Sequence, residues 1–156
     1  PMFISRESQL ANVDDVFNGI LVRGDATGDV VFYGKGAGKL PTASAVVADV
    51  IDCVRHLRSN RKILYWEDAK PDYVEPWDVT PQDVFVRVTG EGDSDSLFDR
   101  AQQVFPKAVR LIRRDEVPGE AGFTLPQIAE QELREKEPDL EKRGLRVANR
   151  VRIADF

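Results

Sequence analysis

The stretch from Val30 to Val50 constrains the fold of this chain more than any other part of the sequence. It combines a short apolar strand, a turn with glycines at positions 34, 36 and 38, and a helix whose first turn contains Pro41. Glycine lacks the Cβ that keeps a backbone away from a ligand, and proline near a helix start removes only an N–H that has no partner. The free N–H groups of a helix start suit phosphate or carboxylate. The stretch therefore predicts a backbone that comes close to a bound anion.

Two interpretations of this turn compete. The dinucleotide-binding fingerprint requires G-x-G-x-x-G between strand and helix, with an acidic residue about 20 positions later. Here the spacing is G-x-G-x-G, and Asp49 and Asp52 lie on the following helix rather than at the end of a second strand. The pattern alone is thus weak, and it favours the second interpretation, a glycine turn that lets a helix pack closely on a strand.

A longer run favours the ligand-binding interpretation. The residues from Phe32 to Asp49, FYGKGAGKLPTASAVVAD, resemble the end of the catalytic region of homoserine dehydrogenases. The upstream segments LANV at 10–13 and VFNGILV at 16–22 are similar to the preceding part of the same family. The resemblance covers about residues 4–57.

The resemblance implies an enzyme that interconverts L-homoserine and L-aspartate 4-semialdehyde with NAD(P), in threonine and methionine biosynthesis. It makes Gly38 the best candidate for a cofactor contact, with Gly36 and Ala37 beside it. The family's catalytic lysine, its carboxylates and its nucleotide-binding fold lie upstream of the matching region. We therefore assign no catalytic residue here, expect the chain to be the C-terminal part of a longer enzyme, and expect this part alone to be inactive.

The resemblance and the composition divide the chain into three parts. Residues 1–58 correspond to the C-terminal segment of the catalytic region, 59–81 to a linker, and 82–156 to a regulatory domain. In the first part we predict an antiparallel hairpin with strands at 16–23 and 30–33. The first strand has apolar residues on both faces, so we expect it to be mostly covered.

The helix predicted from Pro41 to Arg58 has one apolar stripe. Its members are Ala43, Val46, Val47, Val50, Ile51, Val54 and Leu57. In homoserine dehydrogenases the corresponding helix packs on the nucleotide-binding domain, so this chain would expose the stripe or bury it in a non-native way. Cys53 and His56 on the same helix are too few for a structural zinc site, and we assign no metal ligand.

The linker contains Pro71, Pro76 and Pro81, which interrupt any long element. We predict a short strand at 63–66 and anchoring of the linker on a neighbouring surface by its aromatic residues, Tyr65, Trp66, Tyr73 and Trp77. A stacking platform for bases or sugars is the alternative, which the small number of basic residues disfavours.

From residue 83 onward, strands and helices alternate. The strands are predicted at 84–88, 108–113, 121–125 and 145–154, and the helices at 95–105 and 126–136, where Pro138 would end the second helix. The order βαββαβ predicts an α+β fold, a ferredoxin-like plait whose helices cover one face of a four-stranded antiparallel sheet. On the second helix, Glu132 and Lys136 have the spacing of an ion pair.

This element order and its position resemble an ACT regulatory domain, which follows the catalytic region in many homoserine dehydrogenases. The resemblance implies an amino-acid effector such as L-threonine at the loop after the first strand. Gly90 and Gly92 could present N–H groups to a carboxylate there, although Glu91 and Asp93 would oppose it. A stand-alone amino-acid sensor, or a plait used only for homodimerisation, remains open.

Charge and cysteine content restrict the partners. The chain of 156 residues has a formal net charge of −5, which argues against nucleic acid or an anionic membrane as a partner. A single cysteine cannot form an internal disulfide and fits a reducing cytoplasm. We find no apolar run of membrane-spanning length and no signal-peptide pattern, so we expect a cytoplasmic protein.

Overall fold

The computed structural model describes residues 1–57, 67–70, 73–115 and 117–156. The chain divides into two compact units, Pro1–Ser5 with Pro71–Phe156, and Arg6–Lys70. The strand predicted at 63–66, with Tyr65 and Trp66, lies outside the described residues.

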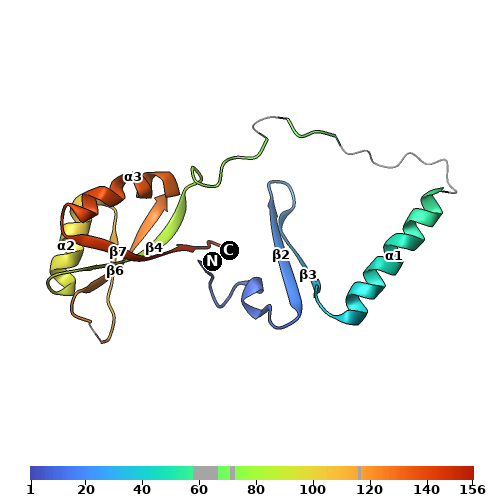
Figure 1. Cartoon of the computed structure of the whole chain (residues 1–156), viewed down its shortest axis with the longest axis horizontal. Helices are drawn as coiled ribbons and strands as arrows, with labels where there is room; N and C mark the ends of the chain where they lie inside the picture. Colours follow the sequence, from blue (N-terminus) through green and yellow to red (C-terminus); the bar gives the residue numbers. More distant parts are fainter. Residues whose placement is uncertain (58–66, 71–72, 116) are drawn as a thin grey trace. The chain divides into compact units, whose positions relative to one another are not determined.

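The unit that begins at Arg6 contains the predicted hairpin and helix (Figure 1). A short 3-10 helix, η1 (Gln9–Asn12), precedes β2 (Phe17–Gly24), which pairs antiparallel with β3 (Gly28–Lys35). The helix α1 (Lys39–Leu57) follows, close to the predicted bounds.

Stacked aromatic rings and an ion pair join the hairpin strands. The rings of Phe17 and Tyr33 are parallel within 3°, with their centroids 5.0 Å apart. Near the turn, Arg23 Nε lies 2.7 Å from Asp29 Oδ1. These cross-strand pairs stabilise the register of the hairpin.

The expectation that the first hairpin strand is mostly covered is wrong for the described structure. Ile20 is 61% exposed and Val22 48% exposed, and their cross-strand neighbour Phe32 is 62% exposed. Only the opposite face is partly covered, because η1 packs against Gly19 through Leu10 and Val13. A two-stranded sheet with a single short helix on it has nothing to bury its second face.

The apolar stripe of α1 is exposed, which was one of the two outcomes predicted for it. No residue of this 19-residue helix is buried, and Val46, Val50 and Val54 are each about half exposed. Among the described residues, no helix is long and apolar enough to cross a membrane.

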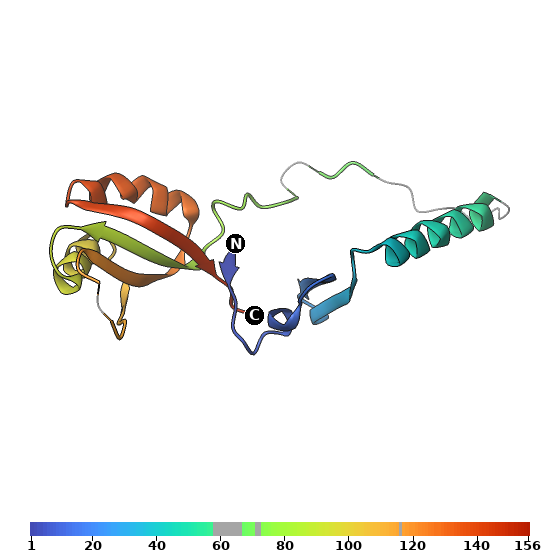
Figure 2. The ribbon, with the colours of Figure 1, turned by 60° about the horizontal axis from the view of Figure 1, so that its bottom comes forward.

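The other unit contains the predicted βαββαβ order (Figures 1 and 2). Its elements are β4 (Gln82–Gly90), α2 (Ser94–Val104), β5 (Val109–Leu111), β6 (Glu120–Ile128), α3 (Glu130–Glu141) and β7 (Leu145–Ile153). We call these six elements the plait. The strands β7, β4, β6 and β5 are hydrogen-bonded neighbours in that order.

The sheet has five strands and is mixed, which corrects the prediction of four antiparallel strands. The additional strand is β1 (Met2–Phe3), which pairs parallel with β7. The Ala154 N–H donates to Phe3 O at 2.8 Å, so the two ends of the chain lie side by side (Figure 1). Two residues far from the plait in sequence carry too little hydrophobic periodicity to predict such a strand.

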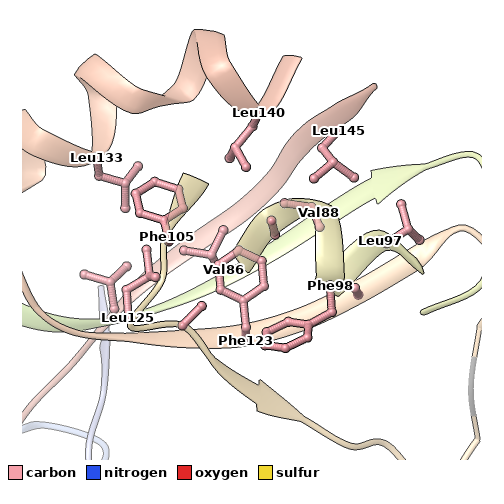
Figure 3. Close-up of a cluster of buried hydrophobic side chains, with 14 of the residues drawn as sticks. Val86, Val88, Leu97, Phe98, Phe105, Phe123, Leu125, Leu133, Leu140 and Leu145 are labelled. Atoms are coloured by element: carbon pink, nitrogen blue, oxygen red, sulfur yellow. The ribbon is translucent and has the colours of Figure 1, made fainter. Parts of the chain in front are cut away.

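The core lies between the sheet and its two helices (Figure 3). Alternate residues of β4, Val84, Val86 and Val88, are at most 3% exposed, as the period of two in a strand requires when one face is covered. They contact the buried faces of the helices, and the core also includes Leu97, Phe98, Ala101, Phe105, Phe123, Leu125, Leu133, Leu140 and Leu145.

The predicted helix at 126–136 is wrong at both ends. β6 continues through Pro126 to Ile128, and α3 runs from Glu130 to Glu141 with Pro138 inside it. Proline lacks an N–H but retains its carbonyl, and Pro138 O accepts from the Lys142 N–H at 3.1 Å, so the last turn still forms. The predicted pair within this helix is confirmed, with Lys136 Nζ 2.6 Å from Glu132 Oε1.

Of the predicted linker aromatics, Trp77 contacts the plait and Tyr73 does not. The guanidinium carbons of Arg134 and Arg152 lie 5.4 and 5.1 Å from the Trp77 ring centroid. Tyr73 is 80% exposed, so its prediction as an anchor is wrong.

Candidate functional site

The glycine turn between β3 and α1 is the candidate site of the N-terminal unit. The Gly36 N–H donates to Val16 O at 3.1 Å, which fixes the turn on the start of β2. Gly38 has φ +122°, a conformation that side chains other than glycine's rarely adopt. Its carbonyl accepts from the Thr42 N–H at 3.1 Å, so Gly38 caps α1.

The start of α1 is suited to an anion. The first N–H groups of a helix have no partner within the helix, and the dipole gives that end a partial positive charge. No acidic residue lies in the first turn of α1, and Lys39 adds a positive charge there. The charge of this helix start is therefore compatible with a phosphate or carboxylate, and binding of such a group here stays a prediction.

The three glycines of the turn have different structural roles. A Cβ added at Gly34 would meet no heavy atom within 4 Å, so this position is open. At Gly36 it would lie 2.7 Å from Asn18 Cγ, so the Asn18 side chain would have to shift, and at Gly38 it would lie 3.3 Å from Pro41 Cδ. Ala37 is exposed between them.

Sequence reasoning did not single out Asn18, although the structure places it at this turn. In the hairpin register Asn18 lies opposite Gly34, and its carboxamide covers Gly36. The pairing of Asn18 with Gly34 could have been found from the sequence, because the register of a hairpin follows from its turn and its alternating side chains, but the position of the carboxamide over Gly36 could not.

Cys53 and His56 are not brought together with other ligands. Cys53 is exposed, and His56 Nδ1 lies 2.9 Å from Asp52 O and 3.3 Å from Asp52 Oδ2 on the same helix. Within the described residues, no group of three or more His, Cys, Asp or Glu side chains is placed to hold a metal ion.

The predicted effector loop of the plait lies between β4 and α2. The Gly90 N–H donates to Gly119 O at 3.1 Å, and the Gly119 N–H donates to Gly92 O at 3.1 Å. Asp93 caps α2 by accepting from the Ser96 N–H at 2.8 Å. A carboxylate ligand would have to displace the bond at Gly90 or use Gly92, so effector binding at these two glycines stays a prediction.

Arg100 holds the same loop against the turn before β7. Its Nη2 donates to Glu91 O at 2.6 Å and its Nη1 to Arg143 O at 2.9 Å. A Cβ at Gly90 would lie 2.6 Å from Gly144 O, so packing alone requires glycine at that position.

Residues 1–51 match the family model of homoserine dehydrogenase. Over 60 residues the chain is 53% identical to the homoserine dehydrogenase of Synechocystis sp., and over 55 residues 54% identical to that of Neisseria gonorrhoeae. The matches cover 38% and 35% of this chain but only 14% and 13% of those enzymes. Over this segment the chain is homologous to homoserine dehydrogenase, an NAD(P)-dependent oxidoreductase.

Solved structures extend the similarity to nearly the whole chain at the level of the fold. A homoserine dehydrogenase from Thiobacillus denitrificans superimposes with a TM-score of 0.78 at 23% identity, over 99% of this chain and 38% of that chain. The homoserine dehydrogenase of S. aureus at pH 6.0 gives 0.65 at 27% identity, over 98% of this chain and 36% of that chain. The hairpin, α1 and the five-stranded sheet thus match part of homoserine dehydrogenase structures.

Proposed function

We propose that this chain is the C-terminal part of a homoserine dehydrogenase, on the premise of its homology to that enzyme over residues 1–51. In this proposal residues 1–58 complete the catalytic region, residues 59–81 are a linker, and residues 82–156 form a regulatory domain. The whole enzyme would interconvert L-homoserine and L-aspartate 4-semialdehyde in the cytoplasm. The observation that carries the proposal is the glycine turn, which lies within the segment that matches the family model and precedes a helix start without acidic residues.

The turn fits a nicotinamide dinucleotide. Gly38 adopts a positive φ and precedes a helix start without acidic residues, and Gly34 has open space in place of a side chain. The free N–H groups at this helix start would favour the phosphates of NAD(P), with Gly36 and Ala37 adjacent. When bound, the cofactor would accept the hydride from homoserine or donate it to the aldehyde; the residues of this chain would hold the cofactor close to the backbone, and we assign none of them as acid or base.

The plait would act as an ACT-like regulatory domain of a homodimer, with L-threonine as effector at Gly90 and Gly92. Its complete core supports folding of this part, and its position after the catalytic segment supports regulation. A module used only for dimerisation, or a stand-alone amino-acid sensor, is the second candidate. The hydrogen bond between the Gly90 N–H and Gly119 O speaks against the effector role, because it engages one of the two proposed donors.

Enzyme assays of two proteins test the proposed activity. The chain of residues 1–156 should not oxidise homoserine with NAD or NADP, whereas the longer protein that contains it should. Turnover by the chain alone would contradict the assignment of the catalytic groups to upstream sequence. A longer protein without turnover would contradict the proposed activity itself.

Thermal melting of the chain with and without threonine tests the effector. A ligand that binds only the native state raises the melting temperature. A rise that Gly92→Ala abolishes would support the effector site, and no rise would leave dimerisation as the role of the plait. Serine at the same concentration controls for unspecific stabilisation.

A further inference from the structure

Asn18 lies where the hairpin meets the glycine turn. It is opposite Gly34 in the antiparallel register, and residues in directly opposite positions project to the same face of a sheet. Gly34 has no side chain, and no heavy atom lies within 4 Å of the place where its Cβ would be. The Asn18 side chain therefore has an open space beside it on this face.

The Asn18 carboxamide occupies the space above Gly36. A Cβ built on Gly36 would overlap Asn18 Nδ2 and lie 2.7 Å from Asn18 Cγ. Real Cβ atoms essentially never make contacts below 3.0 Å, so any side chain at position 36 would require the Asn18 carboxamide, the end of an exposed and flexible side chain, to move away. Gly36 and Asn18 thus form one structural unit.

Asn18 offers a polar side chain at this point of the turn. The Gly36 N–H already donates to Val16 O at 3.1 Å and is not available to a ligand. The Asn18 side chain is exposed, and across the described part of the chain no hydrogen bond to its carboxamide is found. An amide offers one acceptor oxygen and two N–H donors without a charge.

We propose that Asn18 is a cofactor-binding residue whose carboxamide hydrogen-bonds a neutral polar group of the nicotinamide dinucleotide, an amide or a ribose hydroxyl. This inference rests on the proposed function of the glycine turn and adds to it a side chain outside the glycine motif. The start of α1 would hold the phosphates, and Asn18 would orient a neutral group next to them. Gly36 is then needed to leave room for Asn18, rather than for direct approach of its own backbone.

The test uses the full-length dehydrogenase that contains this segment. Asn18→Ala should raise the Kd of the dinucleotide by about three- to tenfold, the effect of one or two lost hydrogen bonds. Quenching of protein fluorescence measures this Kd. The KM for homoserine, at saturating cofactor, should stay unchanged. Circular dichroism and the melting temperature verify that the variant is folded, which is expected because Asn18 is exposed.

A double-mutant cycle tests the link between Asn18 and Gly36. Gly36→Ala displaces the carboxamide and should weaken cofactor binding about as much as Asn18→Ala. The double variant should be no weaker than Asn18→Ala alone, because the added methyl then has room. Additive losses would overturn the inference, since they would mean that Gly36 acts on the cofactor independently.

Gly38→Val separates this inference from the proposed function. If Gly38→Val weakens cofactor binding and Asn18→Ala does not, Asn18 only fills the turn and the inference fails while the proposed function stands. If the wild-type protein binds no dinucleotide, both are overturned.

Discussion

The guanidinium carbon of Arg152 lies 5.1 Å from the centroid of the Trp77 indole. Arg134 lies at 5.4 Å from the same centroid, so two cations from β7 and α3 contact one ring. In the same segment Asp78 O accepts from the Gln131 N–H at 3.0 Å, at the start of α3, where Ala129 provides no side-chain cap. The segment before β4 is thereby attached to the plait and completes the N-terminus of a plait helix.

Trp77→Ala should lower the free energy of unfolding of the plait by about 1 kcal/mol, because two partly exposed cation–π contacts are lost. Urea unfolding of residues 1–156, followed by circular dichroism, measures the change. Tyr73→Ala is the matched control, since Tyr73 is 80% exposed, and should change stability by less than about 0.5 kcal/mol. Equal effects of the two substitutions would contradict the attachment through Trp77.

Gly90→Ala should destabilise the plait by about 1–3 kcal/mol, because its Cβ would lie 2.6 Å from Gly144 O and 2.7 Å from Leu97 Cδ2. At Gly122 the closest atom would be Phe85 Cε2 at 3.4 Å, an ordinary contact, so Gly122→Ala serves as the control. Urea midpoints compare the two variants. A Gly90→Ala variant of wild-type stability would mean that this glycine is not fixed by packing.

Asp83→Ala should lower the free energy of unfolding of the plait by about 1–3 kcal/mol, because Asp83 Oδ1 accepts hydrogen bonds from both the backbone N–H and the Nε2 of Gln127 at 2.9 Å. These bonds hold Gln127 at φ +46°, a conformation that is unfavourable outside glycine. Asp83→Asn retains an acceptor oxygen and should cost clearly less. Equal losses for the two variants would mean that the negative charge of Asp83, which both remove, matters rather than its hydrogen bonds.

Leu97→Ala should destabilise the plait by about 2–5 kcal/mol, since Leu97 is fully buried between α2 and the sheet. Val50→Ala in α1 should change stability by less than about 0.5 kcal/mol, because Val50 is 57% exposed. Denaturant unfolding of both variants measures this difference. A large loss for Val50→Ala would mean that the apolar stripe of α1 is buried in solution.

Acid should loosen the hairpin through Asp29. The hydrogen bond from the Arg23 guanidinium lowers the pKa of Asp29 below its ordinary value of 3.8. A lowered pKa means that the ionised carboxylate favours the folded hairpin at pH values above 3.8, and that this stabilisation is lost as the pH falls through the lowered pKa.

The effect is small because both side chains are about half exposed. Cross-strand nuclear Overhauser effects, followed from pH 6 to 2, should weaken in the wild type at the acid end. Asp29→Asn should remove this dependence, while Asp25→Asn, with the same change of charge in the adjacent turn, should retain it. Identical profiles for all three proteins would contradict the role of the ion pair.

The elements that are predicted correctly from the sequence have strong local signals. The hairpin between 17 and 35, α1 and the βαββαβ order each follow from hydrophobic periodicity and from glycine or proline at the turns. The failed helix at 126–136 shows the limit of such signals. There, two hydrogen bonds from Gln127 to Asp83, 44 residues away, accompany the extension of β6 past Pro126.

The sequence by itself determined which segment resembles a known family, where the glycine turn lies and how the layers of the plait are arranged. These features depend on residue order and on local backbone preferences. Only the tertiary structure decided that Met2 and Phe3 form a fifth strand with β7, that Trp77 contacts two arginines, and that the Asn18 amide covers Gly36. Each of these depends on where distant or opposing segments meet in space. Such positions result from the packing of the whole unit and leave no periodic signal in the chain.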